Sequence, residues 1–434
     1  MKKIYFLLAV LSSALFAQAQ DDVYPAKEYK GLLFITNATV HVGNGQVTDN
    51  ATIEINNGKI VRVGTDIAIP QGDVKVLDAG GRQVYPGLIL PQSDLGLKEI
   101  SGGVRGSNDY RELGDLNPNI RSIVAYNAAS SMINVLKANG ILLAGIVPQG
   151  GTISGSSSVV QLDAWNWEDA AYATDNSIHI NLPSFAAPRR SAAAPTPTKP
   201  EDIAGRALAK VEDIKAFFRE ARAYLQETTY TATNLKLEAV KGLFDKSRKL
   251  FVHAGQVKQM LVAIDFVKEF GFETVIVGGA ESWQVAPLLK ENNIAVILNA
   301  EHNLPSTEDA DFDQPFKTPA MLQKAGVLFA LNDDAGVTRY RNLAFNAGTA
   351  AAFGLTKEEA LSAITLNAAK ILGIAGKTGS IEAGKDANMV ICEGDILDMR
   401  TSIITHAFIQ GREVNLASKQ TQLYERYMRK YGFK

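Results

Sequence analysis

The first polar residues whose spacing suits chemistry lie in residues 84–97. The apolar run at 88–90 follows a proline and a glycine, which predicts a strand that enters a buried core. Gln92, Ser93 and Asp94 stand where that strand ends. In a parallel barrel the reactive groups lie at this end of the strands, so the polar triplet is placed where a barrel performs its chemistry.

The elements that must position this triplet alternate between strands and helices. Residues 257–270 follow a 3.6-residue apolar period that stops at Gly271, which predicts an amphipathic helix with a glycine C-cap. Thr356 and Glu359 form a capping box that opens a later helix. This alternation predicts a parallel sheet, and its length favours an α/β fold with a (β/α)8 TIM-like barrel. Buried strands are expected at 141–147, 250–253, 274–277, 295–298 and 327–331.

The two ends of the chain predict a second, smaller domain. Residues 31–82 alternate with period two, and Asn57-Gly58 between apolar runs is a hairpin signal. Residues 376–415 repeat the β pattern after the barrel region, which we assign to 83–375. Both ends together are expected to form one small β-sandwich, and 416–434 a charged C-terminal helix.

The first 19 residues have the three parts of a secretory signal peptide. Two lysines precede the apolar run at 4–16, and Ala17-Gln18-Ala19 offers small residues two apart. We expect cleavage after Ala19 and a soluble mature chain, which is periplasmic if the source is a Gram-negative bacterium. No other stretch approaches the roughly 20 apolar residues that spanning requires. Cys392 is the only cysteine, so no internal disulfide forms.

The composition is that of a globular protein without a basic surface for nucleic acid. The 434 residues are 46% hydrophobic, enough for one large barrel and a companion domain. The net charge of −2 provides no basic surface for nucleic acid. A small-molecule substrate or a protein partner is therefore expected rather than a polyanion.

Two regions interrupt the predicted repeat. Residues 150–158 are rich in glycine and serine and are interpreted as a loop, but they lack the Gly-Lys-Ser/Thr ending of a phosphate-binding loop. Residues 185–200 are rich in alanine and proline, which predicts a surface excursion that leads into a helix over 201–228.

Several motifs resemble the amidohydrolase superfamily, in its imidazolonepropionase-like branch. The Pro-Gly-Leu-Ile strand at 86–89, the Gly-Lys-Asp-Ala turn at 384–387 and the loop around Asp334 carry the resemblance, which spans about residues 32–416. In that branch the first barrel strand is followed by a His-x-His metal pair. Here Gln92 and Asp94 fill the two histidine positions.

The resemblance implies roles for residues at other strand ends. Superfamily members use one or two metal ions to activate water, and an aspartate after the last strand takes its proton. Asp334 matches this aspartate, and His253 matches the histidine of the fifth strand. Glycines 278 and 279 stand where binuclear members carry another histidine. Asp333 and Asp334 capping the next helix, and His253 as a structural residue, are the alternatives.

The metal ligands implied by the resemblance are Gln92, Asp94, His253 and Asp334. One histidine among three oxygen donors suits at most one divalent ion, zinc or a harder cation. Without a metal, Asp94 and Asp334 could act as a carboxylate pair. The other histidines are interpreted as ordinary polar residues of the sandwich or of loops: His41, His179, His302 and His406. Trp165 and Trp167 are expected to pack in the core rather than rim a pocket.

These features support two functions of different classes. The first is a secreted amidohydrolase-like hydrolase that acts on carbon–nitrogen bonds of a small cyclic amide or peptide-like compound, with Asp334 as the catalytic residue. The second is an inactive barrel that binds or scaffolds, pairing with an intact relative. The missing histidines favour the second, and the retained His253 and Asp334 favour the first. A homo-oligomer is compatible with either.

Overall fold

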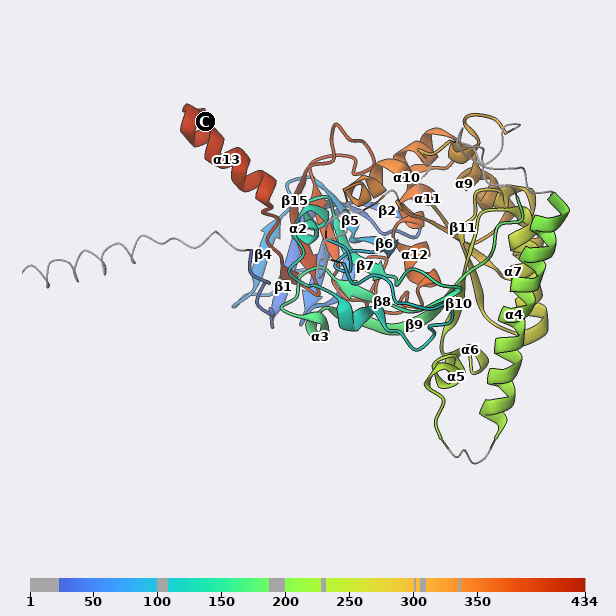
Figure 1. The fold of residues 1–434 in the computed structure, drawn as a ribbon. Coiled ribbons are helices and arrows are strands. Elements are labelled where there is room, and N and C mark those ends of the chain that lie inside the picture. Colours follow the sequence, from blue (N-terminus) through green and yellow to red (C-terminus); the bar gives the residue numbers. More distant parts are fainter. Residues whose placement is uncertain are drawn as a thin grey trace, which may run out of the picture.

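Two eight-stranded sheets organise the chain (Figure 1). The structure is a computed structural model and describes residues 23–99, 108–186, 200–227, 232–299, 302–304, 310–334, 336 and 338–433. The predicted signal peptide and most of the alanine- and proline-rich excursion lie outside the described residues. In the part of the chain that is described, every helix is too short or too polar to cross a membrane.

The first sheet, here called the terminal sheet, is built from both ends of the chain. Its order is β16-β15-β14-β5-β1-β2-β3, with β4 paired to β1. Antiparallel pairing of β14 with β5 joins the two ends, as the sequence predicted. Asn57 and Gly58 have φ of 49° and 77°, which suits the expected hairpin turn. Its strands are β1 Leu32–His41, β2 Val47–Asn56, β3 Lys59–Gly64, β4 Lys75–Asp78, β5 Gln83–Pro86, β14 Met389–Cys392, β15 Ile404–Ile409 and β16 Arg412–Glu413.

The second sheet curls into a nearly closed barrel in which the strands follow chain order from β6 to β13. The end strands of this sheet are β6 and β13. A side chain links them, because the backbone N–H of Gln92 in β6 donates to Oδ1 of Asn332, which directly follows β13, at 3.2 Å. This confirms the TIM-like barrel that the alternation predicted. Its strands are β6 Leu88–Ser93, β7 Ile141–Ile146, β8 Ile153–Gln161, β9 Ala171–Asn181, β10 Lys249–Ala254, β11 Thr274–Gly278, β12 Ala295–Leu298 and β13 Phe329–Leu331.

The interpretation of residues 150–158 as a loop was wrong. Most of this stretch belongs to β8, which is buried throughout and runs antiparallel to both β7 and β9. The barrel sheet is therefore not parallel throughout, contrary to the expectation. A Cβ on Gly155 would lie 2.5 Å from the carbonyl oxygen of Ile120, so the small residues permit a close approach of another segment. Strand preference depends on such packing, which composition alone does not reveal.

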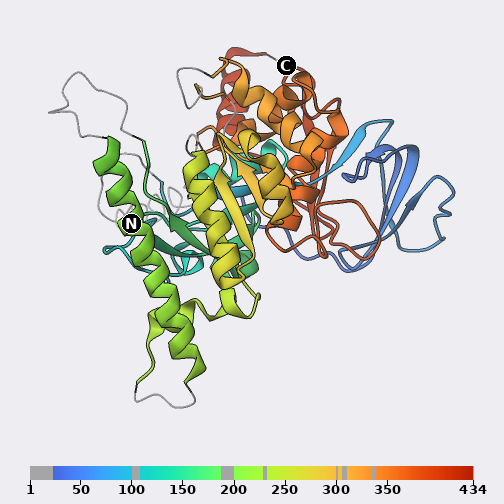
Figure 2. The ribbon, with the colours of Figure 1, turned by 90° about the vertical axis from the view of Figure 1, so that its right-hand side faces the viewer.

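Helices cover the outside of the barrel, and the sequence located several of their ends. Gly271 ends α7 in the left-handed conformation, and Thr356 with Glu359 forms the capping box of α11. In Figure 2, α4 lies outermost beside α7, whereas α13 projects from the body in Figure 1. The α-helices are α2 Ser131–Ala138, α3 Trp167–Ala170, α4 Pro200–Gln226, α5 Leu235–Ala239, α6 Lys241–Phe244, α7 Val257–Phe270, α8 Ala286–Glu291, α9 Gln314–Ala325, α10 Leu343–Ala352, α11 Lys357–Ala363, α12 Leu366–Ile371 and α13 Lys419–Tyr431. The short 3₁₀ turns are η1 Ser122–Ala125, η2 Ser282–Gln284 and η3 Tyr340–Asn342.

Candidate functional site

All four predicted site residues border one pocket at the carboxyl ends of the barrel strands. The pocket, here called the site pocket, has a volume of about 430 Å³. Gln92 and Asp94 come from the end of β6, His253 from β10, and Asp334 from the loop after β13. The fold thus brings together residues up to 242 positions apart in the chain. The further lining residues are Ser93, Val147, Pro148, Gln149, Gly150, Gly151, Asn181, Val277, Asn299 and Tyr340.

Asp94 is buried and its carboxylate already has partners. The hydroxyl of Tyr340 donates to Asp94 Oδ1 at 2.6 Å, and the backbone N–H of Asp94 donates back to that hydroxyl oxygen at 3.2 Å. Lys98 Nζ lies 3.9 Å from Asp94 Oδ2. Burial, together with the charge of Asp94, raises the pKa of Tyr340, so the phenol remains a donor at physiological pH. Asp94 is therefore engaged by protein groups on both oxygens.

His253 is paired with a second histidine, His179 of β9. Register places Asn181 opposite His253, so His179 is its diagonal neighbour, and the two ring nitrogens lie 3.0 Å apart. Ser177 Oγ lies 3.2 Å from the other nitrogen of His179. Burial lowers the pKa of His253 to about 4, and burial together with His253 lowers that of His179 well below 6.5. Both imidazoles are therefore neutral at pH 7.

The interpretation of His179 as an ordinary polar residue of the sandwich or a loop was wrong, since it lies in a barrel strand next to His253. A signal was present in the sequence. Ser177, His179 and Asn181 follow each other with period two, which places three polar side chains on one face of a strand. That face is the interior of the barrel.

The site pocket also presents hydrogen-bond acceptors that no described group satisfies. Gln92 Nε2 lies 3.3 Å from His253 Nε2, which leaves Gln92 Oε1 buried without a partner among the described residues. Oδ1 of Asn299 is likewise buried and lacks a partner there. Buried acceptors are normally paired, and both of these oxygens belong to residues that line the site pocket.

Asp334 is exposed and faces the site pocket, whereas its neighbour Asp333 is fully buried and accepts from Asn346 Nδ2 at 3.3 Å. The charge of Asp334 contributes to the raised pKa of Tyr340, so the two groups are close. Neither aspartate caps a helix, because the next helical turn begins at Tyr340 with Arg339 at its N-cap. The capping alternative is thereby excluded.

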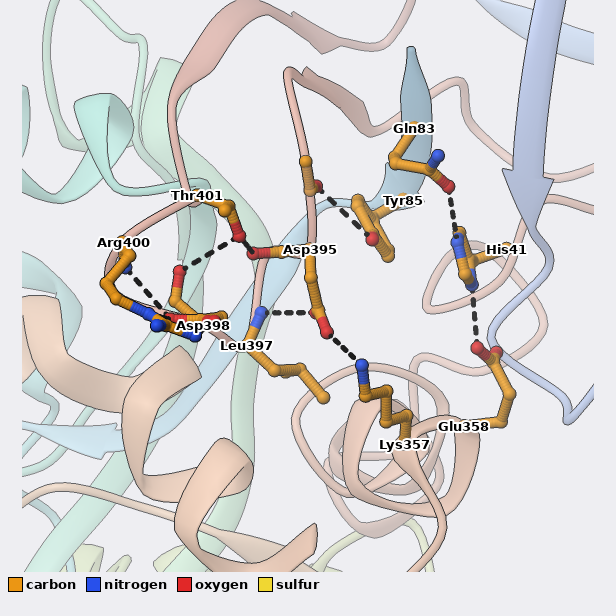
Figure 3. A network of polar contacts seen from close by, with 11 residues as sticks. His41, Gln83, Tyr85, Lys357, Glu358, Asp395, Leu397, Asp398, Arg400 and Thr401 are labelled. Atoms are coloured by element: carbon orange, nitrogen blue, oxygen red, sulfur yellow. Dashed lines mark hydrogen bonds and ion pairs between the residues drawn. The ribbon is translucent and has the colours of Figure 1, made fainter. Parts of the chain in front are cut away.

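A second cluster joins the terminal sheet to the barrel helix α11 and is here called the seam (Figure 3). His41 Nδ1 lies 2.6 Å from Glu358 Oε1, and His41 Nε2 lies 2.9 Å from Gln83 Oε1. Both ring nitrogens thus face oxygen acceptors, the arrangement that an imidazolium requires. The Tyr85 ring is stacked on His41 at 4.4 Å, and Lys357 pairs with Asp395 at 2.7 Å. A pocket of about 230 Å³ lies between these groups.

The seam raises the pKa of His41, in contrast to the histidines of the site pocket. Burial alone lowers this pKa, but the hydrogen bonds to Glu358 and Gln83 and the charge of Glu358 outweigh burial. The expectation that His41 is an ordinary polar residue missed this role. Its separation from Glu358 by 317 positions explains why no local pattern revealed the pair.

The other histidines and the tryptophans that were predicted to lie outside the site differ in their environments. His302 lies in an exposed contact 3.1 Å from Thr349 Oγ1, and His406 belongs to β15. Trp167 packs against the barrel core as expected. The expectation was wrong for Trp165, which is 66% exposed and lies 6.0 Å from the ring of Tyr24. Neither tryptophan lines the site pocket.

Comparisons with known proteins agree on one family. A sequence profile described as the amidohydrolase family matches residues 264–417. An imidazolonepropionase of Thermoplasma volcanium is 25% identical, covering 88% of this chain and 90% of its own. The structure of an amidohydrolase from Thermotoga maritima superposes with a TM-score of 0.75 and 26% identity, covering 88% of this chain and 99% of that one. The profile match, the relative and the solved structure all support the amidohydrolase superfamily as the family that this chain resembles.

Two further relatives are also imidazolonepropionases, which supports that branch of the superfamily. The imidazolonepropionase of Mesorhizobium japonicum is 28% identical over 36% of this chain, and that of Rhizobium meliloti is 34% identical over 24%. The matched segments span 38% and 25% of those two enzymes, so these matches are local. The match to the Thermoplasma volcanium enzyme extends along nearly the whole of both chains.

Amidohydrolases generally work with a divalent metal ion, and the donors of this chain can be tested against such an ion. Within the described ranges, no three or more His, Cys, Asp and Glu side chains form a group that could hold a metal. Asp94 is held by Tyr340 and Lys98, and Nε2 of His253 faces both His179 and Gln92. In this arrangement the residues do not fit a tightly held metal centre.

Proposed function

We propose that this protein hydrolyses a carbon–nitrogen bond of a small cyclic amide or peptide-like compound in the site pocket. The observation that carries the proposal is the pair of unsatisfied acceptors, Gln92 Oε1 and Asn299 Oδ1. An amide or ureide ring offers N–H donors to both oxygens. A pocket of about 430 Å³ is at the small end of the range for ligand sites, which suits a single ring with short substituents.

The acceptors also give the proposed pocket a basis for selectivity. Leaving a buried acceptor unpaired costs about 1–3 kcal/mol, so a ring that presents an ester oxygen in place of N–H binds less well. The neutral His179–His253 pair adds no positive charge for an anionic ring, and the carboxylates Asp94 and Asp334 also line the pocket. These features support a neutral amide as the class of substrate.

Asp334 is the proposed catalytic residue. It borders the pocket, and its exposure leaves the carboxylate within reach of water. In the proposed reaction Asp334 accepts a proton from the attacking water, and the carbon–nitrogen bond breaks with the proton passing to the leaving nitrogen. Gln92 and Asn299 hold the ring by its N–H groups while this occurs.

The proposal includes at most one divalent metal ion per chain. Elemental analysis of the purified protein is expected to find no more than about one transition-metal ion, and chelation is expected to leave the melting temperature unchanged. A resident metal stabilises the folded state by its binding free energy, so a large fall on chelation would contradict this part of the proposal. Two tightly held ions would also contradict it.

Activity is tested on pairs of ring compounds, a cyclic amide and its lactone analogue. The two differ only in whether an amide N–H or an ester oxygen occupies the same ring position. The protein is expected to open the amide ring and to bind the lactone analogue at least tenfold more weakly. Asp334→Asn is expected to reduce turnover by about 10²–10⁴ while calorimetry still detects binding of the amide. Asp66→Asn, an exposed carboxylate far from the pocket in the sequence, is the matched control and should retain activity. Undiminished turnover in Asp334→Asn would overturn the assignment.

A second candidate function is a binding or scaffolding protein that pairs with an intact relative. The observation that favours it is the engagement of Asp94 by Tyr340, which turns a ligand position of the superfamily into a structural contact. Ligand binding without turnover of any amide in the panel, together with a heteromeric complex in solution, would support this candidate instead of the hydrolase.

We also propose that the protein is exported to the periplasm. The proposal rests on the three-part pattern of residues 1–19. Intact-mass measurement of secreted material is expected to give a chain that begins at Gln20. A retained Met1 would contradict export by this signal.

A further inference from the structure

The C-terminal helix α13 is amphipathic but none of its residues is buried. It projects from the body in Figure 1, anchored by Ser418, whose side chain caps the helix by accepting from the N–H of Thr421. Three tyrosines lie at positions i, i+3 and i+7, which places them on one face. Tyr424, Tyr427 and Tyr431 are 64%, 52% and 62% exposed. An unburied aromatic stripe indicates a surface that another body covers.

Basic residues border this aromatic stripe. Lys419, Arg426 and Lys430 are spaced by seven and four residues, so they share the adjacent face of the helix. Lys430 Nζ lies 5.1 Å from the centre of the Tyr431 ring and 5.9 Å from that of Tyr427, which keeps the cation beside the aromatic groups.

The helix has the opposite charge to the remainder of the chain. It carries four basic residues and one acidic residue, whereas the whole chain has a net charge of −2. A net positive charge is therefore concentrated in a helix that has no buried residue against the body of the protein. A partner that is negatively charged and accepts tyrosine rings at its surface would complement both faces.

A lipid surface fits these features better than a second copy of the helix. Pairing two copies through the tyrosine stripe would bring the bordering cations of both helices together, against a single glutamate in each. A helix of 13 residues is also shorter than the heptad repeats that sustain a coiled coil. Tyrosine rings, by contrast, favour the headgroup level of a bilayer, and basic side chains reach anionic headgroups from there.

We propose that α13 is a peripheral membrane-binding helix that docks the protein on anionic phospholipid surfaces. The tyrosines insert at the headgroup level, and the basic residues contact the lipid phosphates. The helix is polar on average, so docking depends on charge and is reversible. This inference is independent of the proposed hydrolase activity, because α13 contributes no residue to the site pocket.

Vesicle binding by the full-length protein tests the proposal. Vesicles of phosphatidylcholine alone are compared with vesicles that contain 30% phosphatidylglycerol, and the bound fraction is measured by co-sedimentation. The anionic vesicles are expected to bind at least tenfold more tightly. Each basic residue near a membrane surface contributes about fivefold in affinity, so Lys419→Gln, Arg426→Gln and Lys430→Gln combined should lose about a hundredfold.

Two further variants separate the aromatic contribution from nonspecific charge. Tyr424→Ser, Tyr427→Ser and Tyr431→Ser combined should weaken binding at least tenfold without lowering the melting temperature. The matched control removes three exposed lysines of the body, by Lys236→Gln, Lys241→Gln and Lys246→Gln, and should bind as the parent does. Equal loss in this control would overturn the proposal. A concentration-dependent dimer that the serine variant abolishes would also overturn it, in favour of a second copy.

Discussion

The site pocket and the seam both enclose histidines, but they shift the histidine pKa values in opposite directions. In the site pocket, His253 faces His179 and Gln92, and burial lowers its pKa to about 4. In the seam, His41 lies between Glu358 and Gln83, and its pKa is raised. Burial acts in the same direction on both. The carboxylate partner in the seam decides the difference.

This difference indicates that the site pocket and the seam have distinct roles. A neutral histidine pair beside unsatisfied acceptors suits recognition of an uncharged ligand. A histidine whose protonated form is stabilised by a carboxylate on another element suits attachment of one element to the other. The site pocket should therefore govern activity and the seam should govern stability. Substitutions in each region test whether this division holds.

The largest effect is expected for Asp334→Asn in the site pocket. Loss of the proposed base should reduce kcat/KM by about 10²–10⁴, the usual contribution of a general base. The melting temperature should stay the same, because Asp334 is exposed. Steady-state kinetics and thermal unfolding measure the two quantities. A variant that is destabilised but fully active per folded molecule would reverse the roles of pocket and seam.

The next largest effect is expected for His41→Ala in the seam. The substitution removes a charge-assisted hydrogen bond and leaves Glu358, whose side chain is 21% exposed, without its partner. We expect a loss of about 2 kcal/mol in unfolding free energy at pH 6. Chemical denaturation measures it, with kcat/KM unchanged. His406→Ala, at an ion-pair distance of 3.8 Å from Glu413, is the weaker matched control.

The effect of Tyr340→Phe is expected to be smaller. The substitution removes the hydroxyl that donates to Asp94 at 2.6 Å, and Lys98 remains nearby as a partial substitute. A loss of about 1 kcal/mol in unfolding free energy is expected. Unchanged stability would mean that Asp94 is not held by Tyr340 in solution and is available as a ligand.

The last test is the pH dependence of stability, which separates the two regions. The raised pKa of His41 means that the folded state holds an extra proton just above pH 6.5, so its stabilisation is complete below that pH and is lost as pH rises through the raised value. For His253 the unfolded state holds the extra proton, so stability falls as pH decreases from 6.5 to about 4.

Unfolding free energies across pH 4–8 measure both contributions. Subtracting the curve of His41→Ala from that of the parent protein should give a difference that is largest in acid and declines toward alkaline pH. The corresponding difference for His253→Gln should have the opposite slope between pH 4 and 6.5. Parallel slopes would show that the two histidines do not differ in charge state.

Local sequence determined much of the fold. The hairpin at Asn57-Gly58, the C-cap at Gly271 and the capping box at Thr356 depend on backbone preferences of a few neighbouring residues, and each was predicted correctly. The barrel strands other than β8 and β9 were predicted from apolar runs. The placement of Gln92, Asp94, His253 and Asp334 at one pocket was predicted from the resemblance to the amidohydrolase superfamily, whose functional residues lie at the strand ends of the barrel.

Only the tertiary structure decided what those side chains contact. β8 is a strand because β7, β9 and the segment at Ile120 pack against its small residues, and composition does not encode those neighbours. His179 meets His253 through the register of β9 with β10, and His41 meets Glu358 across the seam. The pKa of a histidine depends on its burial and on partners that are distant in sequence. The residue types are therefore known from the sequence alone, whereas their protonation depends on the tertiary structure.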